Sequence, residues 1–222
     1  DIGHNAAAAL ALGDHRPRSA PIAVGCHDLP PEQYHADPCP TPSLSRSILR
    51  LLVDRSPAHA RLAHPRLNAD FKPEHKREFD IGSAAHAMLL GEGQALEVIG
   101  ATDYRTKAAQ VAREAAYLVN RIPVLAAQHQ VLTAMVAAAH RQLALYDGWP
   151  LSAEALVEKT WIWQEGDTWC RVRADVVLPR DLIIYDYKTT AGSAHPRAWG
   201  RHLFDEGLGL QAAWYTRALS SD

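Results

Sequence analysis

An acid and a lysine stand two residues apart at the end of an apolar run, in the segment "LIIYDYKTT" of residues 182–190. Side chains alternate across a strand, so Asp186 and Lys188 are expected to project from the same face. Burial of a carboxylate beside an ammonium group is costly unless other groups compensate both charges. The pair is therefore interpreted either as a salt bridge that ends a core strand or as part of a site that uses both charges.

Asp175 supplies a second carboxylate from the preceding segment of the chain. Two strand-like runs, residues 155–164 and 169–179, flank "EGDT", which is typical of a β-hairpin, and the run described above adds a third strand. In such a meander Asp175 is expected near Asp186 and Lys188. Two close carboxylates repel each other unless a cation joins them, and hard divalent ions prefer oxygen ligands. The spacing therefore predicts a Mg²⁺ or Mn²⁺ site of the kind that metal-dependent phosphodiesterases use.

Three further segments carry motifs that narrow this interpretation. They are "FDIGSAAHAMLL" (residues 79–90), "LQAAWY" (residues 210–215) and "YHADPCPTPSLSRSILRLLVDRSPAHARL" (residues 34–62). Together with "RVRADVV" and "LIIYDYKTT", they make the chain resemble the PD-(D/E)xK nuclease superfamily. Within it, the chain is most similar to the RecE-type (exodeoxyribonuclease VIII-like) exonuclease domain, a relative of the RecB-like nucleases. The matched motifs stand in the family's order and span about residues 34–219.

The resemblance implies an α/β (α+β) fold with a restriction-endonuclease-like core. Helices would flank a central mixed sheet, and a mainly helical N-terminal part would precede it. Residues 34–222 would form a single nuclease domain that lacks the family's final strand, whereas residues 1–33, rich in Pro, Ala and His, are expected to form a flexible or extended arm. Periodicity also predicts two long Ala-rich helices, over about residues 104–120 and 123–146.

The resemblance also implies roles for particular residues at the metal site. Asp175 and Asp186 would bind the metal, and His86 would complete one coordination sphere. The main-chain carbonyl of Tyr187 would be a further ligand. Lys188 would orient the attacking water and stabilise the charge that develops on the phosphate. Asp175, Asp186 and Lys188 are thus the expected catalytic centre.

Two helices contribute the remaining expected site residues. The resemblance implies that Gln211 contacts the scissile-end phosphate or orients Lys188, and that Tyr215 packs nearby or contacts the DNA backbone. Taken alone, this i, i+4 pair would be a polar helix surface with an aromatic neighbour. His86 taken alone would be a buried core histidine, whereas as a ligand its nitrogen would favour Mn²⁺. Gly82, one turn earlier, would allow this helix to approach the sheet closely.

Two charged residues of the hairpin have open roles. Arg173 precedes Asp175 by two residues on the same strand face, so it would either bind a phosphate or pair with an acid. Glu158 lies on the first strand of the hairpin. It would either join the metal site or remain a solvated strand acid, and the sequence alone leaves both interpretations open.

The most basic stretch of the chain is residues 46–66. Ser43 or Ser45 is expected to cap a helix there, and free amides at a helix N-terminus attract anions. The resemblance implies that Ser45, Arg46 and Ser47 capture the 5′-terminal phosphate of DNA. A solvated basic face is the alternative.

Composition limits the class of protein. The net charge of −2 excludes a globally basic nucleic-acid binder, so a DNA site must be local. Cys26, Cys39 and Cys170 match neither a disulfide framework nor a four-cysteine iron–sulfur site, and they fit a reducing, cytoplasmic location. The sequence contains no apolar run of about 18 residues, so no membrane span is expected.

The resemblance implies a metal-dependent exonuclease that digests linear double-stranded DNA from the 5′ end and releases 5′-mononucleotides. The expected setting is phage-type or bacterial recombination, with a single-strand annealing protein as partner and a homo-oligomeric ring around the duplex. One alternative is a nuclease of the same superfamily with another polarity or with endonucleolytic activity. The other is a catalytically silent DNA-binding module, although such a module has no need of mutually repelling acids.

Overall fold

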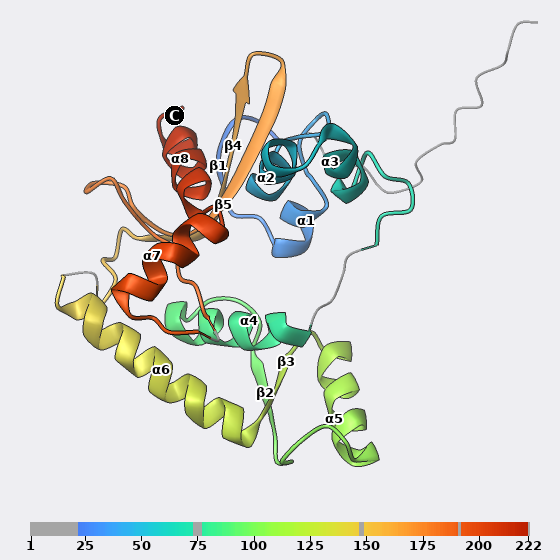
Figure 1. Ribbon diagram of the computed structural model, residues 1–222, viewed down its shortest axis with the longest axis vertical. Helices are drawn as coiled ribbons and strands as arrows, with labels where there is room; N and C mark the ends of the chain where they lie inside the picture. The colour runs from blue at the N-terminus through green and yellow to red at the C-terminus, as the bar shows by residue number, and fades with distance from the viewer. Residues whose placement is uncertain (1–21, 73–76, 147–148, 191, 222) are drawn as a thin grey trace, which may run out of the picture.

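Eight helices and six strands make up the part of the chain that the computed structural model describes, namely residues 22–72, 77–146, 149–190 and 192–221. Four strands form an antiparallel sheet and two form a separate parallel pair (Figure 1). The expected mixed α/β class is confirmed, but the expected single mixed sheet is wrong. Short connections join β4, β5 and β6 of the larger sheet, whereas a parallel pair needs a longer crossover, which a helix supplies here.

The central hairpin consists of β4 (Leu156–Glu165) and β5 (Thr168–Leu178). A two-residue turn, Gly166 and Asp167, joins them, as the "EGDT" segment predicts. Gly166 has a φ of 57°, in the left-handed region that glycine adopts without steric strain. This turn fixes the register of the hairpin, so each residue of β4 has a defined neighbour on β5.

The third strand, β6 (Ile183–Tyr185), pairs antiparallel with β5 and completes the predicted meander. The expectation that this strand continues to residue 190 is wrong. Asp186 and Lys188 lie in the irregular segment directly after it. Their side chains still meet, because Lys188 Nζ lies 2.6 Å from Asp186 Oδ2.

The sheet gains its other edge from the N-terminal segment. β1 (Gly25–His27) pairs antiparallel with β4, so part of the expected arm of residues 1–33 belongs to the sheet. Arg173 of β5 donates a hydrogen bond of 2.5 Å to the carbonyl oxygen of Leu29 in the same segment. Residues 1–21 lie outside the described residues. From residue 22 on, the chain is therefore tied to the sheet.

One face of the sheet packs against α8 (Leu208–Leu219), which lies beside β4 and β5 in Figure 1. Two aromatic side chains of α8, Trp214 and Tyr215, pack against the buried residues of the two strands. These strand residues include Trp161, Trp163, Cys170, Val172 and Ala174. The predicted "LQAAWY" helix is thus confirmed, and its packing places Gln211 beside the end of β6.

Three short helices follow β1, in the mainly helical N-terminal part. They are α1 (Pro31–His35), α2 (Arg46–Asp54) and α3 (Pro57–Ala63). The Ser45 side chain accepts a hydrogen bond of 3.4 Å from the backbone N–H of Ile48, so Ser45 is the cap of α2.

A buried polar network ties these helices to the sheet. The Asp37 carboxylate accepts a 2.7 Å hydrogen bond from the Ser43 hydroxyl and lies 3.2 Å from both His64 Nε2 and an Arg171 guanidinium nitrogen. His64 Nδ1 accepts from the backbone N–H of Arg66, so the proton of a neutral His64 is on Nε2, facing Asp37. Asp37 and Arg171 are both buried, and the network links residues distant in sequence.

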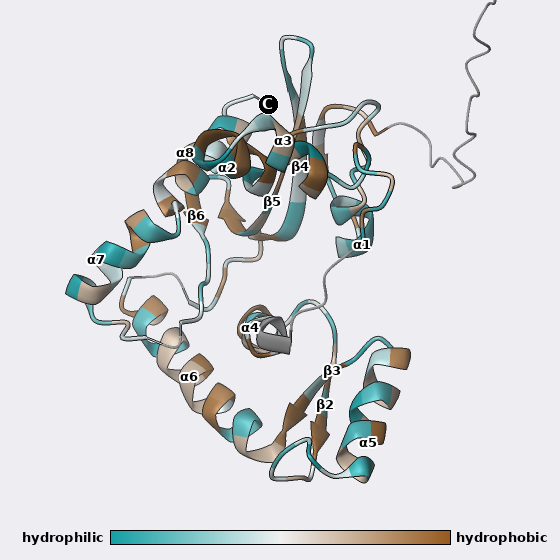
Figure 2. Cartoon of the chain, turned by 45° about the vertical axis from the view of Figure 1, so that its right-hand side comes forward, coloured by the Kyte–Doolittle hydropathy of each residue, from teal (hydrophilic) through white to brown (hydrophobic). Residues whose placement is uncertain are grey.

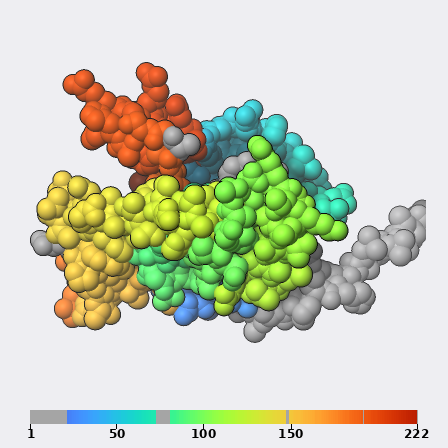
Figure 3. All heavy atoms as spheres, turned by 90° about the horizontal axis from the view of Figure 1, so that it is seen from below, coloured from blue at the N-terminus to red at the C-terminus, as the bar shows by residue number. Residues whose placement is uncertain are grey.

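A second layer lies below the sheet in Figure 1. It consists of α4 (Arg77–Leu90), β2 (Leu96–Ile99), α5 (Lys107–Leu118), β3 (Ile122–Leu125) and α6 (Ala126–Ala144). Residues of α4 to α6, green to yellow in Figure 3, form a continuous face when the molecule is seen from below. The layer thus brings α4, with the "FDIGSAAHAMLL" motif, under the open end of the hairpin.

The predicted helix over residues 123–146 is wrong at its start, because residues 122–125 form β3 instead. All four residues of β3 are buried, and the strand is apolar (Figure 2). Proline lacks a backbone N–H, yet it is tolerated in a strand with an unpaired side, and the β2–β3 pair has only two strands. Burial of this apolar run next to β2 therefore outweighs the local helical pattern.

The last helix to be described is α7 (Pro196–Asp205). It stands beside α8 in Figure 1 and joins it through Glu206 and Gly207. Within the described residues, no helix combines the length and apolar character needed to cross a membrane.

Candidate metal centre

Three side chains from three elements converge beneath the open end of the hairpin. His86 comes from α4, Glu158 from β4 and Asp175 from β5. His86 Nδ1 lies 3.0 Å from Glu158 Oε1, and His86 Nε2 lies 3.0 Å from Asp175 Oδ2. One ligand atom from each residue lies within 4.8 Å of the other two, so the group could hold a metal ion.

Glu158 reaches this position through an unusual backbone conformation. Its φ is 56°, in the left-handed region, between the regular pairs that Val157 and Lys159 make with β5. Such a conformation typically costs about 1–3 kcal/mol for a residue other than glycine, and it occurs preferentially at functional sites. The Glu158 side chain is 18% exposed and accepts from Arg173 Nε at 2.6 Å through its other oxygen, Oε2. Glu158 is thus bound on both oxygens.

The charge of His86 depends on its two acidic neighbours. Burial alone lowers the pKa of His86, but the hydrogen bond with Asp175 and the charges of Asp175 and Glu158 outweigh burial and raise it. Both ring nitrogens face carboxylate oxygens, which suits a doubly protonated ring. A metal would replace one of these protons, since imidazole binds a metal as the neutral ring.

Asp186 and Lys188 lie beside this group. The Asp186 carboxylate accepts a 2.7 Å hydrogen bond from Gln211 Nε2 on Oδ1, and its Oδ2 contacts Lys188 Nζ at 2.6 Å. Burial raises the pKa of Asp186, the nearby charge of Asp175 raises it further, and Lys188 opposes both. Gln211 is 6% exposed and therefore holds Asp186 from inside the protein. The predicted proximity of Asp175, Asp186 and Lys188 is consistent with this geometry.

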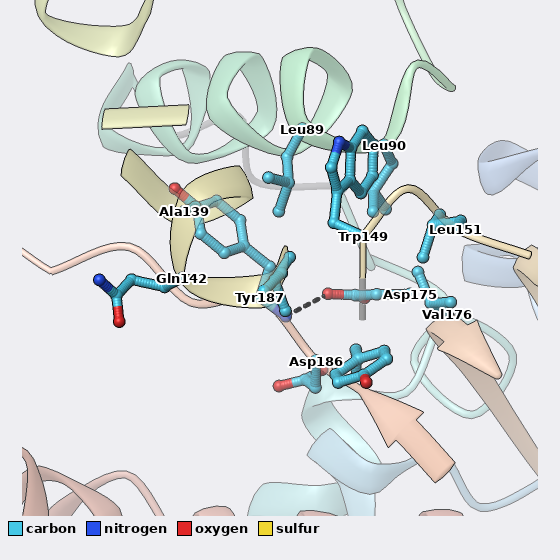
Figure 4. Close-up of a pocket in the computed structure, with 12 residues that line it drawn as sticks. Leu89, Leu90, Ala139, Gln142, Trp149, Leu151, Asp175, Val176, Asp186 and Tyr187 are labelled. Carbon is cyan, nitrogen blue, oxygen red and sulfur yellow. Dashed lines mark hydrogen bonds between the residues drawn. The ribbon is translucent and has the colours of Figure 1, made fainter. Parts of the chain in front are cut away.

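Tyr187 contacts the centre through its main chain. Its N–H donates a 2.7 Å hydrogen bond to Asp175 Oδ2 (Figure 4). The expected role of its carbonyl as a metal ligand remains a prediction, since the described main-chain contact uses the amide instead. This amide fixes the orientation of the Asp175 carboxylate.

An open cavity of about 700 Å³ borders the centre. It is lined by His86, Glu158, Arg173, Tyr187, Lys188 and Thr189, among others. The helix α4 comes close to its far wall, because a Cβ added to Gly82 would lie 3.4 Å from Thr189 Oγ1. This is an ordinary van der Waals distance to a residue beyond the end of β6, so the expected close approach of Gly82 to the sheet remains a prediction. The cavity is wide enough to admit a charged substrate group.

Arg173 contacts the metal centre directly, and Tyr215 contacts the main chain of Arg173. The Arg173 guanidinium pairs with Glu158, one of the two interpretations of the sequence, and its predicted phosphate contact remains a prediction. The Tyr215 hydroxyl donates a 3.0 Å hydrogen bond to the Arg173 carbonyl oxygen. Burial, followed by the charge of Asp186, raises the pKa of Tyr215, so its hydroxyl is a donor at neutral pH.

The basic segment of residues 46–66 makes different contacts from those expected. Arg46 and Arg50 each donate a 2.6 Å hydrogen bond to the carbonyl oxygen of Glu206, at the C-terminal end of α7. Ser45 is buried, and its hydroxyl lies 3.0 Å from that of Ser47. In the described structure these residues dock the α7–α8 connection, and their capture of a DNA phosphate stays a prediction.

The chemistry of the converging donors fits a divalent cation. Two carboxylates and an imidazole are typical ligands of Mn²⁺, and the carboxylates also suit Mg²⁺. The group contains two acids whose like charges a cation would compensate. His86, Glu158 and Asp175 would hold the ion. Asp186 lies outside this group of three, and its expected role as a metal ligand remains a prediction.

Glu158 is the one member of this group that the sequence left undecided. A usable signal was present, because counting outward from a two-residue turn places residue 158 opposite Asp175 in the antiparallel hairpin. Opposite residues of an antiparallel pair project from the same face. Register therefore predicts Glu158 beside Asp175, although it does not predict the left-handed backbone that interrupts the regular pairing at Glu158.

Comparison with known proteins adds no family assignment. Neither protein-family models nor curated proteins nor solved structures match this chain. The site is therefore interpreted from its own geometry.

Proposed function

We propose that this chain is a metal-dependent deoxyribonuclease with a restriction-endonuclease-like core, whose metal is held by His86, Glu158 and Asp175. The observation that carries the proposal is the convergence of these three ligand groups beside an open cavity, which His86, Glu158 and Lys188 line. A candidate cation site and an ammonium group beside one cavity match a phosphodiester, whose charge needs both.

Each residue of the centre has a proposed task. A divalent cation bound there would polarise the phosphate and compensate its charge. Lys188 would donate to a phosphate oxygen or to the attacking water, and Asp186 would hold Lys188 in position. Gln211 would in turn fix Asp186. The positive charge of Lys188 would then lie on the side of the cavity where negative charge develops.

The finer proposal follows the sequence motifs. The ordered segments of residues 34–219 support a 5′-to-3′ exonuclease that acts on linear double-stranded DNA and releases 5′-mononucleotides in phage-type or bacterial recombination. A homo-oligomeric ring and a single-strand annealing partner belong to the same proposal. Ser45, Arg46, Ser47 and Tyr215 are its proposed DNA contacts.

The decisive experiment is digestion of linear duplex DNA labelled at either the 5′ or the 3′ end, with Mg²⁺, Mn²⁺ or EDTA. Metal-dependent release of 5′-labelled mononucleotide is expected. Lys188→Met should lower the rate at least 100-fold, while Lys107→Met, at an exposed position of α5, should not change it. Cutting of closed circles would indicate an endonuclease instead.

Absence of cleavage with either metal would contradict the nuclease proposal. Calorimetric measurement of Mn²⁺ binding then distinguishes two explanations for the absence of cleavage. If the chain binds Mn²⁺ but does not cleave DNA, its metal site serves another function. A chain that binds DNA but no metal would be a silent DNA-binding module.

A further inference from the structure

A second cavity lies behind the metal centre. Asp175 and Asp186 line it together with three aromatic residues, Trp149, Tyr185 and Tyr187 (Figure 4). Its volume is about 250 Å³. Pockets for drug-sized ligands typically measure about 300–1,000 Å³, so this one suits a single flat ring system.

The walls of this cavity are apolar apart from the two acids and Gln142. Leu89 comes from α4, Ala139 and Leu143 come from α6, and Val176 comes from β5. Figure 4 shows Trp149 beside Leu90, and the Asp175 carboxylate directed toward the main chain of Tyr187. Apolar and aromatic walls of this kind favour an aromatic occupant, because a flat ring buries both of its faces there.

The carboxylates restrict the occupant further. A pure hydrocarbon would remove them from water without supplying a hydrogen bond, which is unfavourable. Asp175 uses Oδ2 for its contacts with Tyr187 and His86, so Oδ1 can accept from an occupant. The occupant should therefore be an aromatic ring that carries N–H donors.

We propose that this cavity binds the base of the nucleotide whose phosphate lies at the metal centre, and that it favours bases with an exocyclic amino group. The inference rests on the proposed nuclease function. Tyr187 lines both cavities, so a base in the smaller one and a phosphate in the larger one would lie on either side of a single residue. Adenine, cytosine and guanine carry an exocyclic amino group, whereas thymine lacks one and offers only its ring N3–H as a donor.

The substrate then has an unpaired base at its reacting end. A base that is paired within a duplex cannot enter a pocket of this size, so the strand end must be single-stranded or frayed. Ends that fray easily should react faster than ends locked by G·C pairs.

Binding of nucleosides tests the pocket without metal or cleavage. Calorimetric titration of the full chain with deoxyadenosine, deoxycytidine and thymidine should show at least tenfold weaker binding of thymidine. Ala139→Phe fills the cavity and should abolish binding, whereas Ala138→Phe adds the same ring at an exposed position of α6 and should preserve it. If Ala139→Phe loses its cooperative thermal transition, Leu143→Phe replaces it.

Equal binding of all three nucleosides, or undiminished binding by the filled variant, would overturn the proposal. Cleavage of DNA whose terminal nucleotide lacks its base separates this failure from failure of the proposed function. An unchanged cleavage rate on the abasic end would contradict the proposed base pocket but not the proposed nuclease function. Selective nucleoside binding without any DNA cleavage would contradict the proposed nuclease function but not the base pocket.

Discussion

Arg173 and Glu158 form an ion pair across neighbouring strands, with Arg173 Nε 2.6 Å from Glu158 Oε2. The second carboxylate oxygen, Oε1, lies 3.0 Å from His86 Nδ1. Both oxygens of Glu158 are therefore oriented before a metal binds, as in sites where outer partners fix the ligand groups. Arg173 is in turn held through the Leu29 carbonyl, so the N-terminal segment supports the centre indirectly.

Glu158→Gln should weaken Mn²⁺ binding about 10–100-fold, the range typical of changes to groups around a metal. The amide keeps the size of the side chain but loses the charge that faces His86. Glu154→Gln is the matched control, because Glu154 pairs with Arg180 in an exposed ion pair just before β4. Calorimetric titration with Mn²⁺ measures both affinities, and equal affinities for wild type and Glu158→Gln would remove Glu158 from the metal site.

Gln211→Leu should lower the cleavage rate about 10–100-fold with little change in Mn²⁺ affinity. The variant removes the hydrogen bond to Asp186 Oδ1 while retaining volume, so Asp186 no longer fixes Lys188. Gln130→Leu, at an exposed position of α6, is the control. Single-turnover digestion separates this positioning effect from loss of the metal, and an unchanged rate would contradict it.

Gly82→Ala and Gly82→Leu should differ sharply. The added Cβ of alanine would meet Thr189 Oγ1 at 3.4 Å, an ordinary contact, and alanine is favoured over glycine in a helix by up to about 1 kcal/mol. Leucine must displace Thr189 and the adjoining Lys188, so cleavage should fall while the fold persists. Gly209→Leu, where nothing lies within 4 Å, should cleave normally. Normal cleavage by Gly82→Leu would show that α4 does not set the position of Lys188.

Asp37→Asn should destabilise the protein by about 3 kcal/mol at pH 7, because it leaves the buried Arg171 without its anionic partner. Burial raises the pKa of Asp37, but the hydrogen bond with His64, the charge of Arg171 and the bonds from Ser43 outweigh burial and lower it. A lowered pKa gives a contribution that is present above the ordinary value of 3.8 and is lost as the pH falls below it.

Urea unfolding at pH 7 and at about pH 3 checks this prediction. The difference between wild type and Asp37→Asn should shrink at the lower pH, since Asp37 of the unfolded wild-type chain then binds a proton that the folded protein, with its lowered pKa, binds less readily. The double variant Asp37→Asn/Arg171→Met should be less destabilised than the sum of the single variants. Simple additivity would mean that the two side chains do not stabilise each other.

Sequence patterns predict those parts of the fold that depend on local signals. The turn at Gly166, the cap at Ser45 and the helix around His86 are all encoded within a few residues. β3 is different, because the residues around Pro123 have no strand signal of their own and are fixed by burial beside β2. A local pattern carries no information about that partner.

The candidate site divides in the same way. Asp175 and Lys188 could be predicted because charged residues in apolar strand runs are conspicuous. The contacts of Arg46 and Arg50 with Glu206 could not, since about 160 residues separate the partners and the packing of α2 against α8 brings them together. Basic residues in a short segment look alike whether they bind phosphate or cap a distant helix.

The left-handed backbone at Glu158 bears on how this protein would respond to selection. Glycine adopts that conformation without strain and asparagine with little, so a library selected only for heat resistance should accumulate either residue at position 158. The same variants would lose a carboxylate that faces His86. Selection for metal binding should restore glutamate, even though the melting temperature is then lower. Position 158 is therefore a site where heat resistance and metal binding favour different residues.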